Sequence, residues 1–256
     1  MNEFISNADI VLLPLLAGIM VLFTHVLLGQ EVLKRGIIFL DIAIAQIAAM
    51  GVMISMLLGL EQQDVLTQVI SVVCALSGAI LLHFTEQYFS HRQEAIIGVV
   101  FILAASASLL LLSGNPHGGD QISEIMSGQI LWVGNSQLIQ LALISVFVLL
   151  LLWLRQKYDM NWLFYPAFAV AITSSVQVIG VYLVFATLII PAMTVNAASL
   201  KNIILAFFIG LFSYAIGLII SMVTDFPAGP LIVWVMAISS VTYFISKRLL
   251  THPIND

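Results

Sequence analysis

The sequence predicts an all-α polytopic membrane protein with eight or nine transmembrane helices. Hydrophobic residues make up 61% of the 256 residues and charged residues only 8%, whereas an ordinary soluble domain carries about a quarter charged residues. Apolar runs of the ~20 residues that cross a bilayer as a helix recur from residue 10 to residue 245. These runs are continuous rather than alternating, which favours helices over the strands of a β-barrel. We expect one transmembrane domain over residues 1–256.

The apolar runs give the order of the predicted helices. The seventh run is short and contains Pro191, which removes a backbone donor, so a broken or re-entrant helix is the alternative to a full crossing there. For that reason the predicted number is eight or nine. The runs cover residues 10–29, 37–59, 65–86, 95–113, 137–154, 162–186, 187–199, 203–223 and 229–246.

Charged residues separate these spans and give them an orientation. The loops between them alternate between basic and acidic, and the acidic loops hold no lysine or arginine. By the positive-inside rule the basic side is cytoplasmic, which places the N-terminus outside and the C-terminus inside. The eight basic residues are Lys34, Arg35, Arg92, Arg155, Lys157, Lys201, Lys247 and Arg248.

Several functions are excluded by what the sequence lacks. There is no GxxxxGK[ST] phosphate loop, so ATP-driven activity requires another subunit, and no HExxH or serine-nucleophile motif suggests an intramembrane enzyme. The net charge of -5 offers no basic surface for nucleic acid. A single cysteine, Cys74, permits neither an internal disulfide nor a cysteine-based metal site. Residues 1–9 lack the basic flank of a cleavable signal.

Three segments carry glycine and proline at characteristic places. The first, EAIIGVVF at residues 94–101, contains Gly98 and is followed, after an apolar span, by ISEIMSGQILWV at residues 122–133. The second, VQVIGVYLVFATLIIPAMTVNAA at residues 176–198, contains Gly180 and Pro191. Glycine beside a proline-interrupted helix is typical of an unwound turn near a path between helices, although helix packing alone is the alternative for Gly180.

The third segment, DFPAGP, precedes the last span. Its prolines can start a helix, and the Asp225 carboxylate can lie near that helix's N-terminus, so we expect a loop and capping role rather than ion binding. The residues concerned are Asp225, Pro227, Gly229 and Pro230.

In this order and spacing the three segments resemble the permease subunits of metal-ion ABC importers, which take up zinc, manganese or iron in bacteria. The resemblance covers most of the chain and implies a multi-pass protein of the bacterial plasma membrane with the ABC-3-type importer permease fold. It further implies that two copies form a path for a divalent metal ion, which is substrate rather than cofactor. A separate ATP-binding cassette ATPase subunit and an extracytoplasmic metal-binding protein would be its partners, with lipid around the helices.

Asp41 is the first candidate for the path, because an ionisable residue inside an apolar run indicates function. In the resembled family an Asp and a His usually stand four apart on the second helix. Here Gln46 takes the place of the His and Asp41 lies one residue early, about 140° from Gln46 around a helix. A carboxylate with an amide favours a weakly held hard cation. His25 in the first span could supply an imidazole ligand, although helix packing is the alternative role for this residue. Other polar residues in or near the spans are Glu31, His83 and Gln177.

The loop SGNPHGGDQISE could attract a divalent cation at an entrance through His117, Asp120 and Glu124, with a solvated loop as the alternative. The resemblance also implies that this loop is a docking surface for the external binding protein.

One departure from the resembled family affects coupling to an ATPase. Members of the resembled family usually carry a longer cytoplasmic stretch between these two spans, with a helix that presses on the ATPase. At the same place this chain has only RQKYDMNW, residues 155–162. If coupling persists, Tyr158 and Asp159 are the candidate contacts. A membrane scaffold or sensor that has lost transport is the competing hypothesis.

Overall fold

The protein was analysed as a computed structural model, which describes residues 2–61, 64–112, 118–195 and 199–251. Within those ranges all regular structure is helical, in agreement with the predicted all-α class. The α-helices are α1 (Asn2–Arg35), α2 (Leu40–Leu57), α3 (Val65–Phe89), α4 (Gln93–Leu112), α5 (Gly118–Ser127), α6 (Asn135–Tyr158), α7 (Phe164–Ile179), α8 (Val181–Thr194), α9 (Leu200–Thr224) and α10 (Ala228–Thr251), and the 3-10 turns are η1 (Ser90–Arg92), η2 (Ile130–Trp132) and η3 (Asn161–Leu163).

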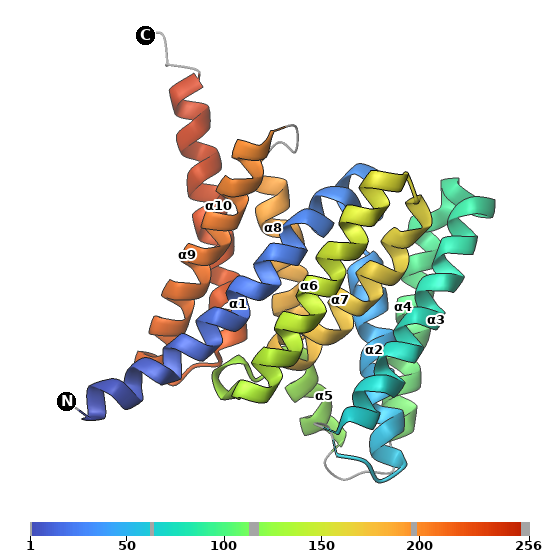
Figure 1. Ribbon diagram of the computed structural model, residues 1–256, viewed down its shortest axis with the longest axis horizontal. Helices are drawn as coiled ribbons and strands as arrows, with labels where there is room; N and C mark the ends of the chain where they lie inside the picture. Colours follow the sequence, from blue (N-terminus) through green and yellow to red (C-terminus); the bar gives the residue numbers. More distant parts are fainter. Residues whose placement is uncertain (1, 62–63, 113–117, 196–198, 252–256) are drawn as a thin grey trace.

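Nine of the described helices run through the bundle, each antiparallel to the one before it, while the short α5 lies at one end (Figure 1). By length and hydropathy seven stretches qualify as membrane spans, one of which, Val65–Leu112, contains both α3 and α4. The remaining helix, α8, is apolar but has only 14 residues. The two ends of the chain lie at opposite ends of the bundle (Figure 1). Nine is the upper value of the predicted range.

The predicted boundary between the sixth and seventh spans is wrong. We expected one span over residues 162–186 and a break afterwards, but the chain turns at Gly180, which separates α7 from α8 at φ +80°. Pro191 lies inside α8, which continues to Thr194. Glycine adopts positive φ without the steric penalty of other residues, so the turn forms at Gly180.

The helices divide into a buried group and an outer group. Buried residues make up 72% of the span window in both α2 and α7 but only 17% in α6 and 22% in the stretch of α3 and α4. α2 and α7 therefore form the centre. The outer helices show apolar side chains on their outward faces, such as Leu110, Leu143 and Trp234, as expected where lipid is the solvent.

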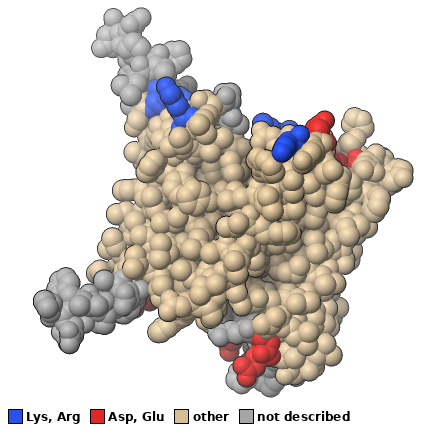
Figure 2. Space-filling model, viewed as in Figure 1, with Lys and Arg blue, Asp and Glu red and all other residues tan. Residues whose placement is uncertain are grey.

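Charged side chains collect at the two ends of the bundle. Lys and Arg in Figure 2 lie at the end that α10 reaches with its C-terminus, with some acidic side chains among them, while the opposite end shows acidic side chains only. We call these the basic end and the acidic end. The tan surface between them carries no charge in this view, as expected of a surface embedded in the bilayer.

Candidate functional site

Asp41 lies in the first turn of α2, close to the basic end, and not deep within a span as its apolar surroundings in the sequence indicated. Its side chain is fully buried, and neither carboxylate oxygen has a hydrogen-bond partner. The start of α4 lies nearby, because the Glu94 Oε1 accepts a 3.4 Å hydrogen bond from the Phe39 backbone N–H. Burying a carboxyl group without a partner is costly, so Asp41 is the candidate for a functional position among the polar residues of α2.

The other two candidate path residues are also buried. Gln46 lies in α2 and is 5% exposed. His25 in α1 is fully buried; its Nδ1 lies 3.0 Å from Thr24 Oγ1 and 3.1 Å from the Val21 carbonyl, while its Nε2 has no partner. No hydrogen bond or ion pair joins His25 to Asp41 in the described structure. Nor do the described residues bring three or more His, Cys, Asp or Glu side chains together as a metal cluster.

α1 and α8 approach one another closely beside Pro191. A side chain at Gly29 would collide with the backbone carbonyl of Leu188, and Gln30 Nε2 donates to the Ala192 carbonyl at 3.2 Å. His25 lies one turn from Gly29 on the same face of α1. The unpartnered His25 nitrogen is therefore on the side of α1 that meets α8.

Three glycines from separate segments meet at the acidic end. Gly128 (φ +73°) and Gly180 (φ +80°) are in backbone contact, so that a side chain on either would collide with the other's segment. A side chain on Gly229 would strike the Ser127 carbonyl. We call Gly128, Gly180 and Gly229 the glycine contact. It gives Gly180 a packing role and joins all three segments that carried the resemblance, because Gly128 lies in ISEIMSGQILWV. Gly98 differs, since nothing lies within 4 Å of a side chain built there.

The DFPAGP segment forms the turn from α9 to α10. Asp225 adopts φ +57° after the last turn of α9, its backbone N–H donating to the Ser221 carbonyl at 2.9 Å. α10 begins at Ala228, after Pro227, and Pro230 lies in its first turn, where the missing N–H leaves no intrahelical bond unmade. Asp225 thus ends α9 rather than lying at the start of α10, and its side chain is exposed.

The entrance-loop residues are only partly within the described structure. His117 lies outside the described residues. Asp120 and Glu124 belong to α5 at the acidic end, where Asp120 is exposed.

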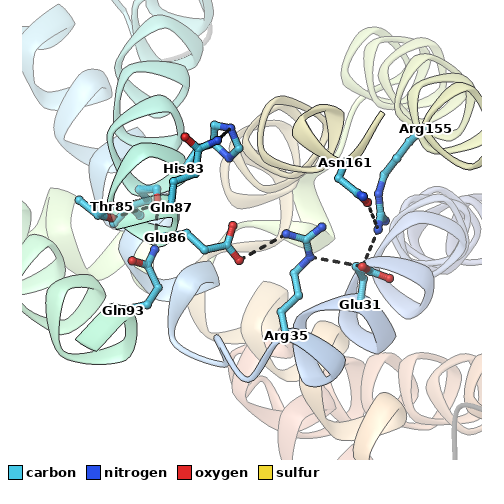
Figure 3. A network of polar contacts seen from close by, with 10 residues as sticks. Glu31, Arg35, His83, Thr85, Glu86, Gln87, Gln93, Arg155 and Asn161 are labelled. Carbon is cyan, nitrogen blue, oxygen red and sulfur yellow. Dashed lines mark hydrogen bonds and ion pairs between the residues drawn. The ribbon is translucent and has the colours of Figure 1, made fainter. Parts of the chain in front are cut away.

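An ionic network at the basic end joins α1, α3 and α6 (Figure 3). Glu31 Oε1 accepts from Arg155 Nη2 at 2.5 Å and from Arg35 Nε at 3.3 Å, and Arg35 Nη1 donates to Glu86 Oε1 at 3.5 Å. The guanidiniums of Arg35 and Arg155 also lie 4.4 and 5.7 Å from the ring centroid of Phe164. Sequence reasoning noted Glu31 as a polar residue near a span but could not identify its partners, which lie on other helices.

The segment between α6 and α7 projects beside this network. Tyr158 is 58% exposed, and Asp159, at φ +54°, ends α6 and is exposed too. Both side chains are therefore accessible at the basic end, whereas Arg155 fixes the base of the segment to α1.

A cavity of about 190 Å³ lies between α2, α3, α6 and α7 towards the acidic end. Its lining combines apolar side chains with polar side chains that carry no charge, which distinguishes it from the other polar sites of the bundle. Sequence reasoning singled out only Gln177 of this group; the spacing of Gln137 and Gln140, three residues apart at the start of a span, was the available signal. The polar lining residues are Gln68, Ser71, Gln129, Ser136, Gln137, Gln140, Thr173, Ser174 and Gln177.

Solved structures share this fold. The chain superposes on a chain of PsaBC from Streptococcus pneumoniae in complex with Fab with a TM-score of 0.76 at 23% identity, covering 95% of each chain. A chain of an inward-facing, putative metal-chelate type ABC transporter gives a TM-score of 0.69 at 15% identity, over 92% of this chain and 85% of the other.

Sequence relatives extend over most of the chain. The manganese transport system membrane protein MntC of Listeria monocytogenes is 26% identical over 242 residues, 86% of this chain and 83% of the relative. A probable metal transport system membrane protein of Chlamydia muridarum is 24% identical over 200 residues, 70% of this chain and 68% of the relative. The pattern of the ABC 3 transport family matches residues 7–160 and 156–247. The chain therefore belongs to the ABC 3 transport family, as a divergent member, which confirms the resemblance inferred from its three segments.

Proposed function

We propose that the chain is the membrane-spanning permease of an ATP-binding cassette importer for a divalent metal ion, with manganese or zinc as the metal. Family membership supports a transport subunit, and the relatives' names include manganese and chelated-iron transport systems. Direction follows from the resemblance. The chain itself supplies the path and no covalent chemistry.

The observation that carries this proposal is Asp41, a buried carboxylate whose two oxygens have no hydrogen-bond partner. If Asp41 is ionised, no group of the protein compensates its charge, so a passing cation would stabilise the carboxylate by direct contact. Because only one carboxylate is offered, with Gln46 and His25 elsewhere in the core, the cation would be held weakly. Weak binding suits a path through which the ion must leave again.

The two ends of the bundle take different partners in this proposal. The basic end faces the cytoplasm by the positive-inside rule and meets the ATPase, with Tyr158 and Asp159 as the exposed contacts. The acidic end faces outward and receives metal from an extracytoplasmic binding protein, with Asp120 and Glu124 near the entrance. Two copies of the chain form the complete path, and the outward apolar faces not covered by the second copy meet lipid.

The proposal is tested by measuring metal uptake into vesicles that contain the chain and its ATPase, with an isotope or a metal-specific dye as the readout. Uptake of Mn²⁺ or Zn²⁺ should require ATP and both subunits, and Asp41→Asn should lower the initial rate about tenfold or more. Asp64→Asn is the matched control, because Asp64 is exposed and its carboxylate accepts a 2.9 Å hydrogen bond from the Glu61 backbone N–H. Equal uptake of manganese, zinc and iron with and without the chain would reject the importer function.

A scaffold or sensor that has lost transport is the second hypothesis, favoured by the short segment from Asp159 to Leu163 between α6 and α7. It predicts that the ATPase binds the chain without ATP-dependent uptake. Co-purification of the two subunits together with absent uptake would support it over the importer.

A further inference from the structure

The cavity between α2, α3, α6 and α7 is lined by amide groups whose N–H donors are left over. Gln140 Oε1 accepts a hydrogen bond from Gln68 Nε2 at 3.0 Å. Gln137 Oε1 accepts from the Gly134 backbone N–H, also at 3.0 Å. Both carbonyl oxygens are thus used, and the N–H groups of Gln137 and Gln140 stay available to the cavity. Gln177 Nε2 is buried and has no hydrogen-bond partner in the described structure. Buried donors nearly always have an acceptor, so the cavity is suited to a ligand that brings acceptor oxygens.

The hydroxyl groups of the cavity, by contrast, need no ligand. Ser71 donates to the Ala48 carbonyl at 2.8 Å. Thr173 and Ser174 each donate to a carbonyl of the preceding turn of α7, at 2.8 and 3.0 Å. The described residues that line the cavity carry no charge, so an ion bound there would stay uncompensated. The volume of about 190 Å³ is more than ten times the roughly 10–15 Å³ that one water requires, so a larger uncharged group fits.

The polar and apolar parts of the lining lie at different depths. Gln137 and Gln140 are close to the start of α6, roughly 3 and 8 Å along the helix axis, whereas Ile144 lies roughly 14 Å along it. Gln68 and Gln177 likewise lie within one turn of the acidic ends of α3 and α7. The interfacial layer of a bilayer is about 5–8 Å thick on each side of the hydrocarbon core. The amides are therefore at the level of lipid esters, and Ile144 is at the level of the acyl chains.

The cavity reaches the outer surface of the bundle between α3 and α6. α7 lies between these two outer helices (Figure 1) and packs against both, so that the central helices α2 and α7 form the floor of the cavity. Trp132 lines the cavity and is 82% exposed, and Ser136 is exposed as well. Beside the cavity, Val73 of α3 and Leu143 of α6 present apolar side chains outward. A molecule dissolved in the membrane can therefore enter from the side.

We propose that this cavity binds the ester region of a membrane glycerolipid. Its ester carbonyls accept hydrogen bonds from the amides of Gln177 and of Gln137 or Gln140, and an acyl chain passes out between α3 and α6. Because the lining has no charge, the cavity selects the diester backbone rather than a headgroup. The site is separate from the metal path, since Asp41 lies at the opposite end of α2, and the inference does not depend on the proposed function.

A matched pair of lipids tests the role of the ester carbonyls. The full chain is purified in detergent, stripped of lipid and titrated with a diacyl phosphatidylcholine or with the dialkyl ether analogue of equal chain length. Native mass spectrometry counts the lipid that is bound. The diester should occupy one saturable site and bind at least about fivefold more tightly than the ether, because a net hydrogen bond contributes about 1 kcal/mol. Triacetin, which has ester groups but no long chain, should not displace it at equal concentration.

Matched variants locate the site. Val72→Phe should fill the cavity and abolish saturable binding, because Val72 lines it. Val73→Phe is the control, because Val73 is 56% exposed and does not line the cavity. Gln177→Leu should weaken the diester about fivefold and reduce its advantage over the ether. Gln87→Leu, on the exposed surface near the other end of α3, should change neither.

Five outcomes would overturn the inference. The absence of a saturable lipid site would leave the cavity to water, and equal binding of the two lipids would remove the role of the carbonyls. Displacement by triacetin would make the ligand a water-soluble ester. Equal effects of Val72→Phe and Val73→Phe would place the lipid elsewhere on the surface. Ready disulfide crosslinking of two copies through Val69→Cys, in a Cys74→Ala background, would assign the gap between α3 and α6 to a second copy. None of these measurements involves metal uptake, by which the proposed function is judged.

Discussion

The guanidinium of Arg155, at the end of α6, donates a 2.5 Å hydrogen bond to the carboxylate of Glu31 in α1, a residue 124 positions earlier in the chain. The same Glu31 oxygen accepts from Arg35 Nε at 3.3 Å. One acid therefore holds two guanidiniums and fixes the short segment that follows α6 against α1. If an ATPase presses on that segment, its motion is transmitted to α1 through Glu31.

We expect Glu31→Gln to lower the melting temperature of the chain in detergent, because two partly buried guanidiniums would lose their common counter-charge. The Glu31 side chain is 21% exposed, so solvent screening reduces the ~3–5 kcal/mol of a fully buried pair to about 1–3 kcal/mol. For a chain of this size each kcal/mol corresponds to about 2–4 °C. Glu61→Gln, an exposed acid at the other end, should change nothing; equal melting temperatures for both variants would contradict a structural role of the network.

The glycine contact leads to a second prediction. Gly180→Ala and Gly128→Ala should each sharply reduce the yield of folded protein, since positive φ alone costs about 1–2 kcal/mol in a non-glycine residue and the added methyl group collides with backbone. Gly98→Ala should be tolerated, because its side chain meets open space. Fluorescence-detected gel filtration measures this. Loss of the folded-protein peak for Gly98→Ala, or a normal peak for Gly180→Ala, would show the contact to be misassigned.

Asp41→Asn should separate transport from stability. The carboxyl group makes no hydrogen bond that the amide would lose, and an amide cannot take on a buried, unpaired charge. The melting temperature should therefore stay constant or rise while metal uptake falls. A lower melting temperature in parallel with lower uptake would instead make Asp41 a structural residue.

Local sequence features predicted the helices and their charges well, because hydropathy and loop composition are local properties. The break between α7 and α8 was misplaced because Pro191 is the visible helix breaker, while the turn at Gly180 is stabilised by Gly128 from a distant segment. A contact of that kind leaves no periodic signal in the sequence.

The polar sites, too, could be predicted only in part, because contacts between distant segments leave no signal in the sequence. Asp41 and His25 were identified because an ionisable residue stands out in an apolar run. Their burial, and whether a hydrogen bond or ion pair joins them, depend on how the helices pack. The cavity escaped notice because its amides are spread over α3, α6 and α7, and each one alone is typical of a helix end.

Cysteine labelling of right-side-out membrane vesicles tests the orientation. In a Cys74→Ala background, Glu61→Cys at the acidic end should react with a membrane-impermeant maleimide, whereas Lys157→Cys at the basic end should react only after the membrane is opened. Both side chains are exposed, so both should label equally in detergent, which controls for reactivity. Because α1 starts at the acidic end and α10 finishes at the basic end (Figure 1), this pattern places the N-terminus outside. The reverse pattern would invert the topology and, with it, the assignment of the Tyr158 and Asp159 segment to the ATPase.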